Sequence, residues 1–366
     1  MKHIDLNWIK PLFLGSIFLG VGGGGKANNI LSFCEEIFSK GLTIPLLDIE
    51  DLEETNNYAA VGLIGSPEVI DDFYCTGKEG IKALETLQSI TKAEVKGIFT
   101  LECAGVNVLY PILVASLLEL PFIDGDSMGR AFPELQMTTF HLNKQPLMPF
   151  ILCNTGLRIY EYYDVDNFLL DLNIRHVLSE YNNIGFFASC ASKGSSLRKM
   201  LIPRTLSFTY EIGKVFMDIS SYEDIINNLI KSTKNSIYGA SIELFLGEID
   251  NIENVDHKNW QSIYMKGIKH YKGEAFQILT QNENLIAYKN NALAAMAPDL
   301  ISLISLDTLT PISNNDLSKG MKVAVIGTPA PLVWKTIDGL NIVGPKCFGY
   351  KSPYKPLEKL YFNYYY

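Results

Sequence analysis

The chain has 366 residues, of which 47% are hydrophobic and 19% are charged, and its formal net charge at pH 7 is −9. These values are typical of a globular protein with about two domains. They argue against a basic nucleic-acid surface and against a basic membrane-binding helix, so we expect neither nucleic acid nor membrane as a partner.

The cysteines and the N-terminal apolar run indicate the compartment. Six cysteines are scattered without a C-x-x-C pair, which argues against a zinc ribbon and against a disulfide scaffold. The run PLFLGSIFLGV resembles a short signal-peptide core, but Asp5 precedes it and no A-x-A cleavage site follows. Eleven residues are also too few to span a membrane. We therefore expect reduced thiols and a cytoplasmic protein.

A run of glycines separates the first two predicted helices, at 5–19 and 27–39. It formally matches G-x-G-x-x-G, but that dinucleotide fingerprint needs a preceding strand, and residues 5–19 have helical periodicity. A nucleotide-dependent oxidoreductase is therefore the weakest hypothesis. Glycine backbone before a helix can approach and bind an anionic or polar group. We predict that Gly22, Gly23, Gly24 and Gly25 bind substrate; a turn that only permits close packing is the alternative.

The middle of the chain alternates between two periodicities. Strands are predicted at 42–47, 59–64, 98–101, 121–123, 147–153, 157–163 and 184–189, and helices at 80–90, 107–119, 166–181, 197–217 and 222–230. This alternation predicts an α/β domain over 1–231, with a mixed or parallel sheet flanked by helices. From Ser232 on, short apolar runs between polar turns predict a β-rich domain over 232–366, whose tail could pack back on the first domain.

Acidic residues follow two neighbouring predicted strands. Glu102 follows the strand 98–101, and Asp124 and Asp126 follow the strand 121–123. A strand–helix–strand unit is right-handed and parallel, and ligands bind beyond the carboxyl ends of such strands. We therefore predict that these three carboxylates are catalytic. Turn or helix-cap roles are the alternative for each of them.

Further polar residues surround these acids in the sequence. Arg130 can bind a ring carbonyl or carboxylate through paired hydrogen bonds, and Glu134 lies in the same Gly/Pro-bearing loop. Asn107 could orient a ring, although it is also a candidate N-cap for the helix 107–119. We predict that all three residues bind substrate.

Several stretches, taken in order, resemble one family. They are LGVGGGG (19–25), LECAGVN (101–107), FIDGDSMGRAFPELQM (122–137), TLSFTYEIGK (205–214), QNENLIA (281–287), APDLI (297–301) and VGPKCFGY (343–350). Together they resemble the S-methyl thiohydantoin desulfurase-like family, from about Trp8 to Leu357. The chain departs from the expected pattern at Cys103-Ala104, where small residues, often glycine, are expected.

The resemblance implies an N-terminal α/β domain, a β-rich C-terminal domain and chemistry on five-membered hydantoin-like rings, in which oxygen replaces a ring sulfur. It also implies a hydantoinase- or oxoprolinase-type partner, and we allow for a homo-oligomer. A non-catalytic ligand-binding or accessory subunit of such a system is the alternative function.

Two chemical hypotheses fit such a reaction. Two neighbouring carboxylates tend to split their pKa values, so one can act as base while the other supplies a proton. A divalent metal is the second hypothesis, with Asp124, Asp126, Glu134 and His141 as candidate ligands. The spacing of these four residues matches no established metal motif.

Overall fold

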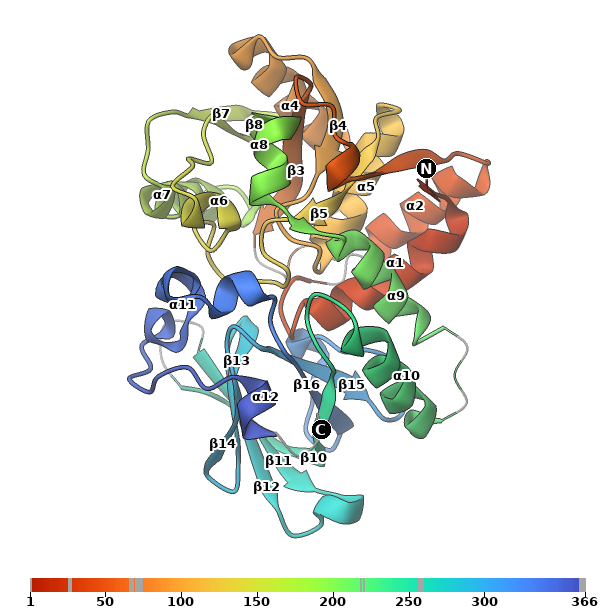
Figure 1. Cartoon of the computed structure of the whole chain (residues 1–366), viewed down its shortest axis with the longest axis vertical. Helices are drawn as coiled ribbons and strands as arrows, with labels where there is room; N and C mark the ends of the chain where they lie inside the picture. The colour runs from red at the N-terminus through yellow and green to blue at the C-terminus, as the bar shows by residue number, and fades with distance from the viewer. Residues whose placement is uncertain are drawn as a thin grey trace. The chain divides into compact units, whose positions relative to one another are not determined.

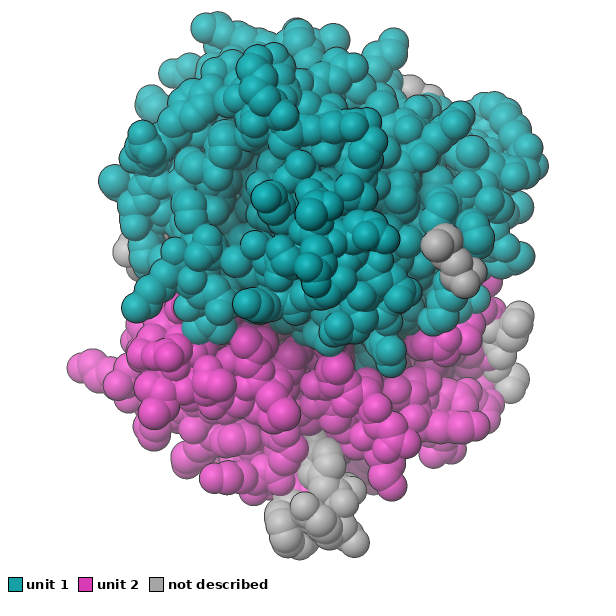
Figure 2. All heavy atoms as spheres, turned by 45° about the horizontal axis from the view of Figure 1, so that its top comes forward, with its two compact units in different colours: residues 1–16, 25–129, 134–210 teal, residues 17–24, 130–133, 211–366 magenta. Residues whose placement is uncertain are grey.

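The computed structural model describes residues 2–25, 28–65, 69, 75–217, 219, 221–255 and 260–361. The chain divides into two compact units, which are described separately (Figure 2). Unit 1 comprises residues 1–16, 25–129 and 134–210, and unit 2 comprises 17–24, 130–133 and 211–366. The sequence predicted one boundary, between residues 231 and 232. In the structure, the main part of unit 2 begins at Glu211, and two short segments from the N-terminal half of the chain, 17–24 and 130–133, also belong to unit 2.

Unit 1 contains the strands and helices of the N-terminal part (Figure 1). The strands are β1 (Lys2–Ile4), β2 (Ile44–Asp48), β3 (Asn57–Gly65), β4 (Val95–Phe99), β5 (Phe122–Asp126), β6 (Phe150–Asn154), β7 (Ile159–Tyr162), β8 (Ile184–Lys193) and β9 (Ile202–Pro203). The helices are α2 (Asn28–Ser39), α4 (Lys78–Thr91), α5 (Val106–Leu117), α6 (Thr139–Leu142), α7 (Asn167–Ser179), α8 (Gly194–Met200) and the 3-10 turn η1 (Ile49–Asp51). Helices α1 (Leu6–Leu19) and α9 (Thr205–Lys214) begin in unit 1 and end in unit 2.

The described strands of unit 1 form a mixed sheet in the order β1-β2-β5-β4-β3-β8-β6-β7, and β9 pairs with β5. Strands β2, β5, β4 and β3 run parallel to their neighbours in that group, as the strand–helix–strand reading predicts. The remaining pairings are antiparallel.

Strand β3 illustrates why the sheet is covered on both faces. Ala59, Val61 and Leu63 belong to one core cluster, which also contains residues of α2, α4 and α5. Tyr58 and Ala60 belong to a second cluster, together with residues of α7 and α8. Because successive side chains of a strand point to opposite faces, a nearly continuous apolar strand requires helices on both sides of the sheet.

Unit 2 contains a seven-stranded antiparallel sheet in the order β14-β13-β12-β11-β10-β16-β15, as expected for a β-rich domain. The strands are β10 (Ile242–Asn254), β11 (Trp260–Gly267), β12 (Ala275–Gln281), β13 (Glu283–Lys289), β14 (Ala292–Met296), β15 (Leu300–Ser305) and β16 (Lys322–Thr328). The helices are α10 (Tyr222–Lys234), α11 (Ile337–Val343) and α12 (Leu357–Leu360), with 3-10 turns η2 (Lys269–Tyr271), η3 (Asn314–Asp316), η4 (Leu332–Lys335) and η5 (Pro345–Phe348). The aromatic tail 362–366 lies outside the described residues.

Three element predictions were wrong in detail. The single helix expected over 197–217 is two helices, α8 and α9, separated by β9. Pro203 explains the break, because proline disfavours helical backbone in the residue before it, and Arg204 then has a φ of 59°. The strand expected at 98–101 ends at Phe99, and the N-cap of α5 is Gly105 rather than Asn107.

No helix in the described ranges combines the length and the apolar character that crossing a membrane requires.

Candidate active site

Glu102 lies just beyond the carboxyl end of β4, where its side chain is partly exposed. One of its carboxylate oxygens, Oε1, accepts a hydrogen bond from Asn107 Nδ2 at 2.9 Å. Asn107 lies in the first turn of α5 and is also bonded to the backbone of Leu63 in β3. The helix and the central strand of the sheet therefore together hold the carboxylate of Glu102.

Asp126 ends β5 and is fully buried. The backbone N–H of Cys103 donates to Asp126 Oδ2 at 2.7 Å, and the N–H of Gly129 lies 3.0 Å from both carboxylate oxygens. Burial raises the pKa of Asp126 to about 7, and the backbone amides of Cys103 and Gly129 oppose that shift. Asp126 thus ties the loop that carries Glu102 to the loop that follows β5.

Asp124 is also buried, and it holds the start of helix α9. Its Oδ1 accepts the N–H of Ser207 at 2.8 Å and its Oδ2 accepts the Ser207 hydroxyl at 2.5 Å. Burial raises the pKa of Asp124, and the two hydrogen bonds from Ser207 lower it. Both carboxylate oxygens are therefore engaged by the first turn of a helix, which is the geometry of a capping residue.

The thiol of Cys103 lies among these three acids. Burial raises its pKa well above the ordinary value, and the charges of Asp126, Asp124 and Glu102 raise it further. The hydroxyl of Thr205 donates to Cys103 Sγ at 3.4 Å. A nucleophilic cysteine requires the thiolate, so this environment makes Cys103 a poor nucleophile.

Glu134 and His141 have hydrogen-bond partners other than these three acids. Gln136 donates a side-chain hydrogen bond to Glu134, whose pKa is raised first by burial and then by the charge of Asp171. His141 Nδ1 lies 3.2 Å from the amide nitrogen of Asn167. The described residues contain no group of three or more His, Cys, Asp and Glu side chains that could hold a metal ion. The four candidate ligands are thus not gathered into one such group.

The glycine run follows helix α1 directly, as the periodicity of residues 5–19 predicted, so the element before it is a helix and not the strand that the dinucleotide fingerprint needs. Gly22, Gly23 and Gly24 belong to unit 2 and Gly25 to unit 1. The carbonyl of Gly22 accepts the N–H of Asn314 at 2.9 Å. A Cβ atom at Gly22 would overlap the Asn314 side chain, and one at Gly23 would overlap the Glu283 carboxylate. Gly22 and Gly23 therefore permit a close approach within unit 2, which is the packing alternative. The predicted role of the four glycines in binding substrate stays a prediction.

Replacing Gly22 with alanine should show whether the close approach to Asn314 requires glycine. Gly22 has a φ of +92° and meets Asn314, whereas Gly41 has a φ of +87° and no atom near its would-be Cβ. Both substitutions carry the backbone penalty of a positive φ, but only Gly22→Ala also overpacks, at a further cost of about 1–3 kcal/mol. Urea denaturation of both variants measures the difference. Equal losses in the two variants would show that the contact with Asn314 does not require glycine.

Arg130 is fully buried in unit 2. Its Nε donates to the carbonyl of Ala131 at 2.9 Å, its Nη2 to that of Asn284 at 3.2 Å, and its Nη1 to those of Pro298 and Asp299 at 3.3 and 2.9 Å. These contacts give Arg130 a structural role in joining three segments of unit 2. The predicted role of Arg130 in binding substrate stays a prediction, because a sequence does not distinguish an arginine that binds substrate from one that binds backbone carbonyls.

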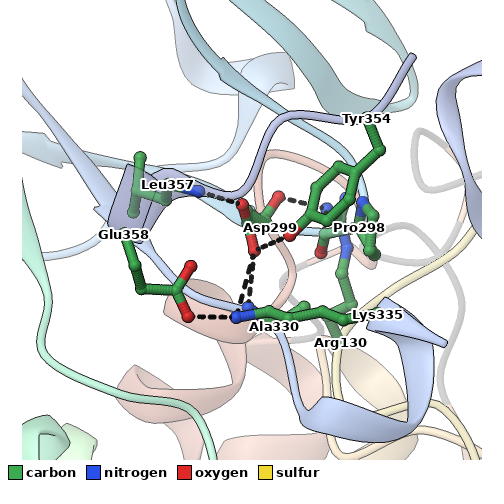
Figure 3. A network of polar contacts seen from close by, with 8 residues as sticks. All are labelled: Arg130, Pro298, Asp299, Ala330, Lys335, Tyr354, Leu357 and Glu358. Atoms are coloured by element: carbon green, nitrogen blue, oxygen red, sulfur yellow. Dashed lines mark hydrogen bonds and ion pairs between the residues drawn. The ribbon is translucent and has the colours of Figure 1, made fainter. Parts of the chain in front are cut away.

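A second polar network in unit 2 was not predicted (Figure 3). Asp299 is fully buried and accepts hydrogen bonds from Ala330 N–H, Leu357 N–H and the Tyr354 hydroxyl, at 2.8, 2.8 and 2.9 Å. Lys335 Nζ lies 3.9 Å from the same carboxylate. The stretch APDLI contains Asp299, but nothing in the spacing of its residues indicates these partners, which come from the C-terminal segment.

The stability of the protein should fall as pH rises through the range in which Asp299 and Asp126 ionise. Burial raises their pKa values from 3.8 to about 6 and about 7, so the folded state binds a proton that the unfolded state has already lost. Stability is then fully present below about pH 4 and is lost as pH rises through the folded pKa, by on the order of 2–3 kcal/mol for Asp299.

Urea denaturation between pH 4 and pH 8 measures this loss. Asp299→Asn should flatten the part of the curve between about pH 4 and pH 6. The exposed carboxyl of Asp307 provides the control, and Asp307→Asn should leave the shape unchanged. A stability curve of the unsubstituted protein that rises from pH 4 to pH 7 would contradict the prediction.

The fold and the site together define a two-domain protein with an α/β unit, an antiparallel β unit and three acidic residues at the carboxyl ends of two parallel strands, β4 and β5. Two family models match the chain: "S-Me-THD-like, N-terminal domain" over residues 7–159 and "S-Me-THD-like, C-terminal domain" over residues 165–357. The chain therefore belongs to the S-methyl thiohydantoin desulfurase-like family.

A solved structure has the same fold. The crystal structure of a protein from Chromobacterium violaceum matches with a TM-score of 0.81 and 20% sequence identity, over 98% of this chain and 100% of that one. No curated protein matches the chain.

Proposed function

We propose that this protein hydrolyses a sulfur-bearing, hydantoin-like five-membered ring and that Glu102 transfers the protons. The family supports the substrate class. The observation that carries the role of Glu102 is a difference in exposure among the three acids: Glu102 is partly exposed, whereas Asp124 and Asp126 are buried and accept hydrogen bonds from the backbone. Glu102 is thus the acid best placed to meet a water molecule.

This assignment differs from the expectation that all three carboxylates are catalytic. In the proposal, Asp126 fixes the loops around Glu102 and Asp124 fixes helix α9, so both position other groups. Glu102 removes a proton from water, whose oxygen attacks the ring carbon that bears the S-methyl group. The carbon–sulfur bond then breaks. One water hydrogen ends on the ring nitrogen and the other, returned by Glu102, on the departing methanethiol, which leaves a ring carbonyl.

Two further parts of the proposal concern ligands and partners. A ring carboxylate or carbonyl is the group that the glycine amides would bind, because backbone N–H groups before a helix attract negative charge. A hydantoinase- or oxoprolinase-type protein is the proposed partner, since such an enzyme would open the hydantoin that this reaction produces.

Purified protein mixed with an S-methyl thiohydantoin tests the proposal. We expect methanethiol and the corresponding hydantoin to appear in equal amounts, with a rate proportional to protein concentration. The alternative is an accessory subunit that binds the ring without converting it, and the burial of Asp124 and Asp126 favours it. This alternative predicts that the ring raises the melting temperature of the protein but is not turned over. Stabilisation without methanethiol would therefore replace the hydrolase proposal by the binding one.

A further inference from the structure

Strand β3 extends beyond the end of its parallel neighbour β4. The two strands pair from Asn57 to Ala60, and β4 ends at Phe99, opposite Ala60. Strand β3 continues to Gly65, so on the side that faces β4 no strand among the described residues pairs with the backbone of Leu63. Buried backbone groups need hydrogen-bond partners, and Leu63 is 2% exposed.

The side-chain amide of Asn107 takes the place of the missing strand. The N–H of Leu63 donates to Asn107 Oδ1 at 2.7 Å, and Asn107 Nδ2 donates to the carbonyl of Leu63 at 2.9 Å. Gly62 permits this approach, because a Cβ atom there would lie 2.8 Å from Asn107 Oδ1. Since the strand offers one donor and one acceptor, the two bonds also determine which end of the amide is oxygen and which is nitrogen.

The amide has a second N–H hydrogen, and that hydrogen is directed to Glu102. Asn107 Nδ2 lies 2.9 Å from Glu102 Oε1. The amide cannot rotate without breaking both bonds to Leu63, so the carboxylate of Glu102 has a fixed donor rather than an adjustable one. A group held in this way is preorganised for proton transfer at a defined position.

We propose that Asn107 is a positioning residue: its amide, locked to the unpaired end of β3, orients the carboxylate of Glu102 for the reaction. The inference rests on the proposed function of Glu102, and it replaces the prediction that Asn107 binds the substrate ring. Asn107 acts on Glu102 and does not need to touch the substrate.

Asn107→Asp tests the inference with an isosteric side chain that no longer donates to Glu102. We expect kcat for methanethiol release to fall about 10–100-fold with a change in KM of less than about threefold, because orientation and not binding is lost. The acidic limb of the pH profile of kcat/KM should move to higher pH, since a second carboxyl beside Glu102 opposes its ionisation.

A matched control and a reciprocal variant separate positioning from folding. Asn154 is another buried asparagine of unit 1, and its Oδ1 accepts the N–H groups of Gly156 and Arg158 without contacting a carboxylate. Asn154→Asp should leave the acidic limb in place. In the double variant Asn107→Asp/Glu102→Gln, the glutamine amide can donate to the aspartate carboxylate, so the hydrogen bond between the two positions is restored in the opposite direction. The double variant should therefore be more stable than Asn107→Asp alone.

The two readouts distinguish the possible failures. If the unsubstituted protein releases no methanethiol, the proposed function is wrong, and the stability of the reciprocal variant still decides whether Asn107 holds Glu102. If turnover is present but Asn107→Asp leaves both kcat and the acidic limb unchanged, Asn107 does not position Glu102 and the inference is wrong.

Discussion

Replacing Glu102 with glutamine should lower kcat for methanethiol release by at least ~100-fold, the usual scale for loss of an acid–base group. Glutamine keeps the shape of the side chain and can still accept a hydrogen bond from Asn107 through its carbonyl oxygen, so the fold should be retained. It cannot take a proton from water. KM should change little if the ring is bound by other groups.

Two comparison variants make the loss at Glu102 specific. Glu85 is an exposed acid of helix α4, and Glu85→Gln should retain full activity. Asp126→Asn should lose less activity than Glu102→Gln, because asparagine can still accept an N–H bond from Cys103 or Gly129. Steady-state rates of methanethiol release, measured at one pH for all variants, provide the comparison. The opposite order, with Asp126→Asn inactive and Glu102→Gln active, would show that the proton-transfer role belongs to Asp126.

Replacing Arg130 with methionine should give the largest loss of stability among the variants considered. The side chain is fully buried and its donors reach four backbone carbonyls, so methionine would leave several buried acceptors without a donor. Each unsatisfied buried group costs about 1–3 kcal/mol, so the free energy of unfolding should fall by at least about 3 kcal/mol. Arg130→Lys should recover part of this loss, because lysine keeps the charge and can still donate hydrogen bonds. The recovery should be incomplete, because the ammonium donates from one nitrogen and cannot reach all four carbonyls.

Arg204 provides the matched control for Arg130. Its side chain is 70% exposed and forms an ion pair with Asp48 at 3.1 Å. Exposed ion pairs contribute little, so Arg204→Met should unfold at nearly the same urea concentration as the unsubstituted protein. Urea denaturation followed by circular dichroism measures both variants. If Arg130→Met were as stable as Arg204→Met, Arg130 would not hold the segments of unit 2 together.

The sequence predicted most elements because their signals are local. In strand β3, a continuous apolar run in a chain of alternating strands and helices indicated a strand covered on both faces, and the two core clusters around Ala59 and Tyr58 confirm it. The break between α8 and α9 also had a local signal in Pro203, which was outweighed by the helical spacing on both sides of it.

The partners of the site residues could not be predicted in the same way. Asn107 and Leu63 are 44 residues apart in the sequence, and Asp124 and Ser207 are 83 residues apart. Hydrogen bonds over such distances follow from the order of strands in the sheet, which one sequence does not specify. The sequence therefore placed Glu102 beyond β4 correctly, but Asp124 and Asp126 belong to β5 and do not follow it. It also did not reveal which of these acids hold the backbone and which is exposed.

Turnover in water enriched in oxygen-18 tests most directly whether the protein delivers water to a ring carbon. We expect the hydantoin product to carry one oxygen-18 atom for each methanethiol released, with Glu102→Gln forming neither product at a comparable rate. Methanethiol released without incorporation of the label, or a ring that binds and is recovered unchanged, would contradict hydrolysis at Glu102.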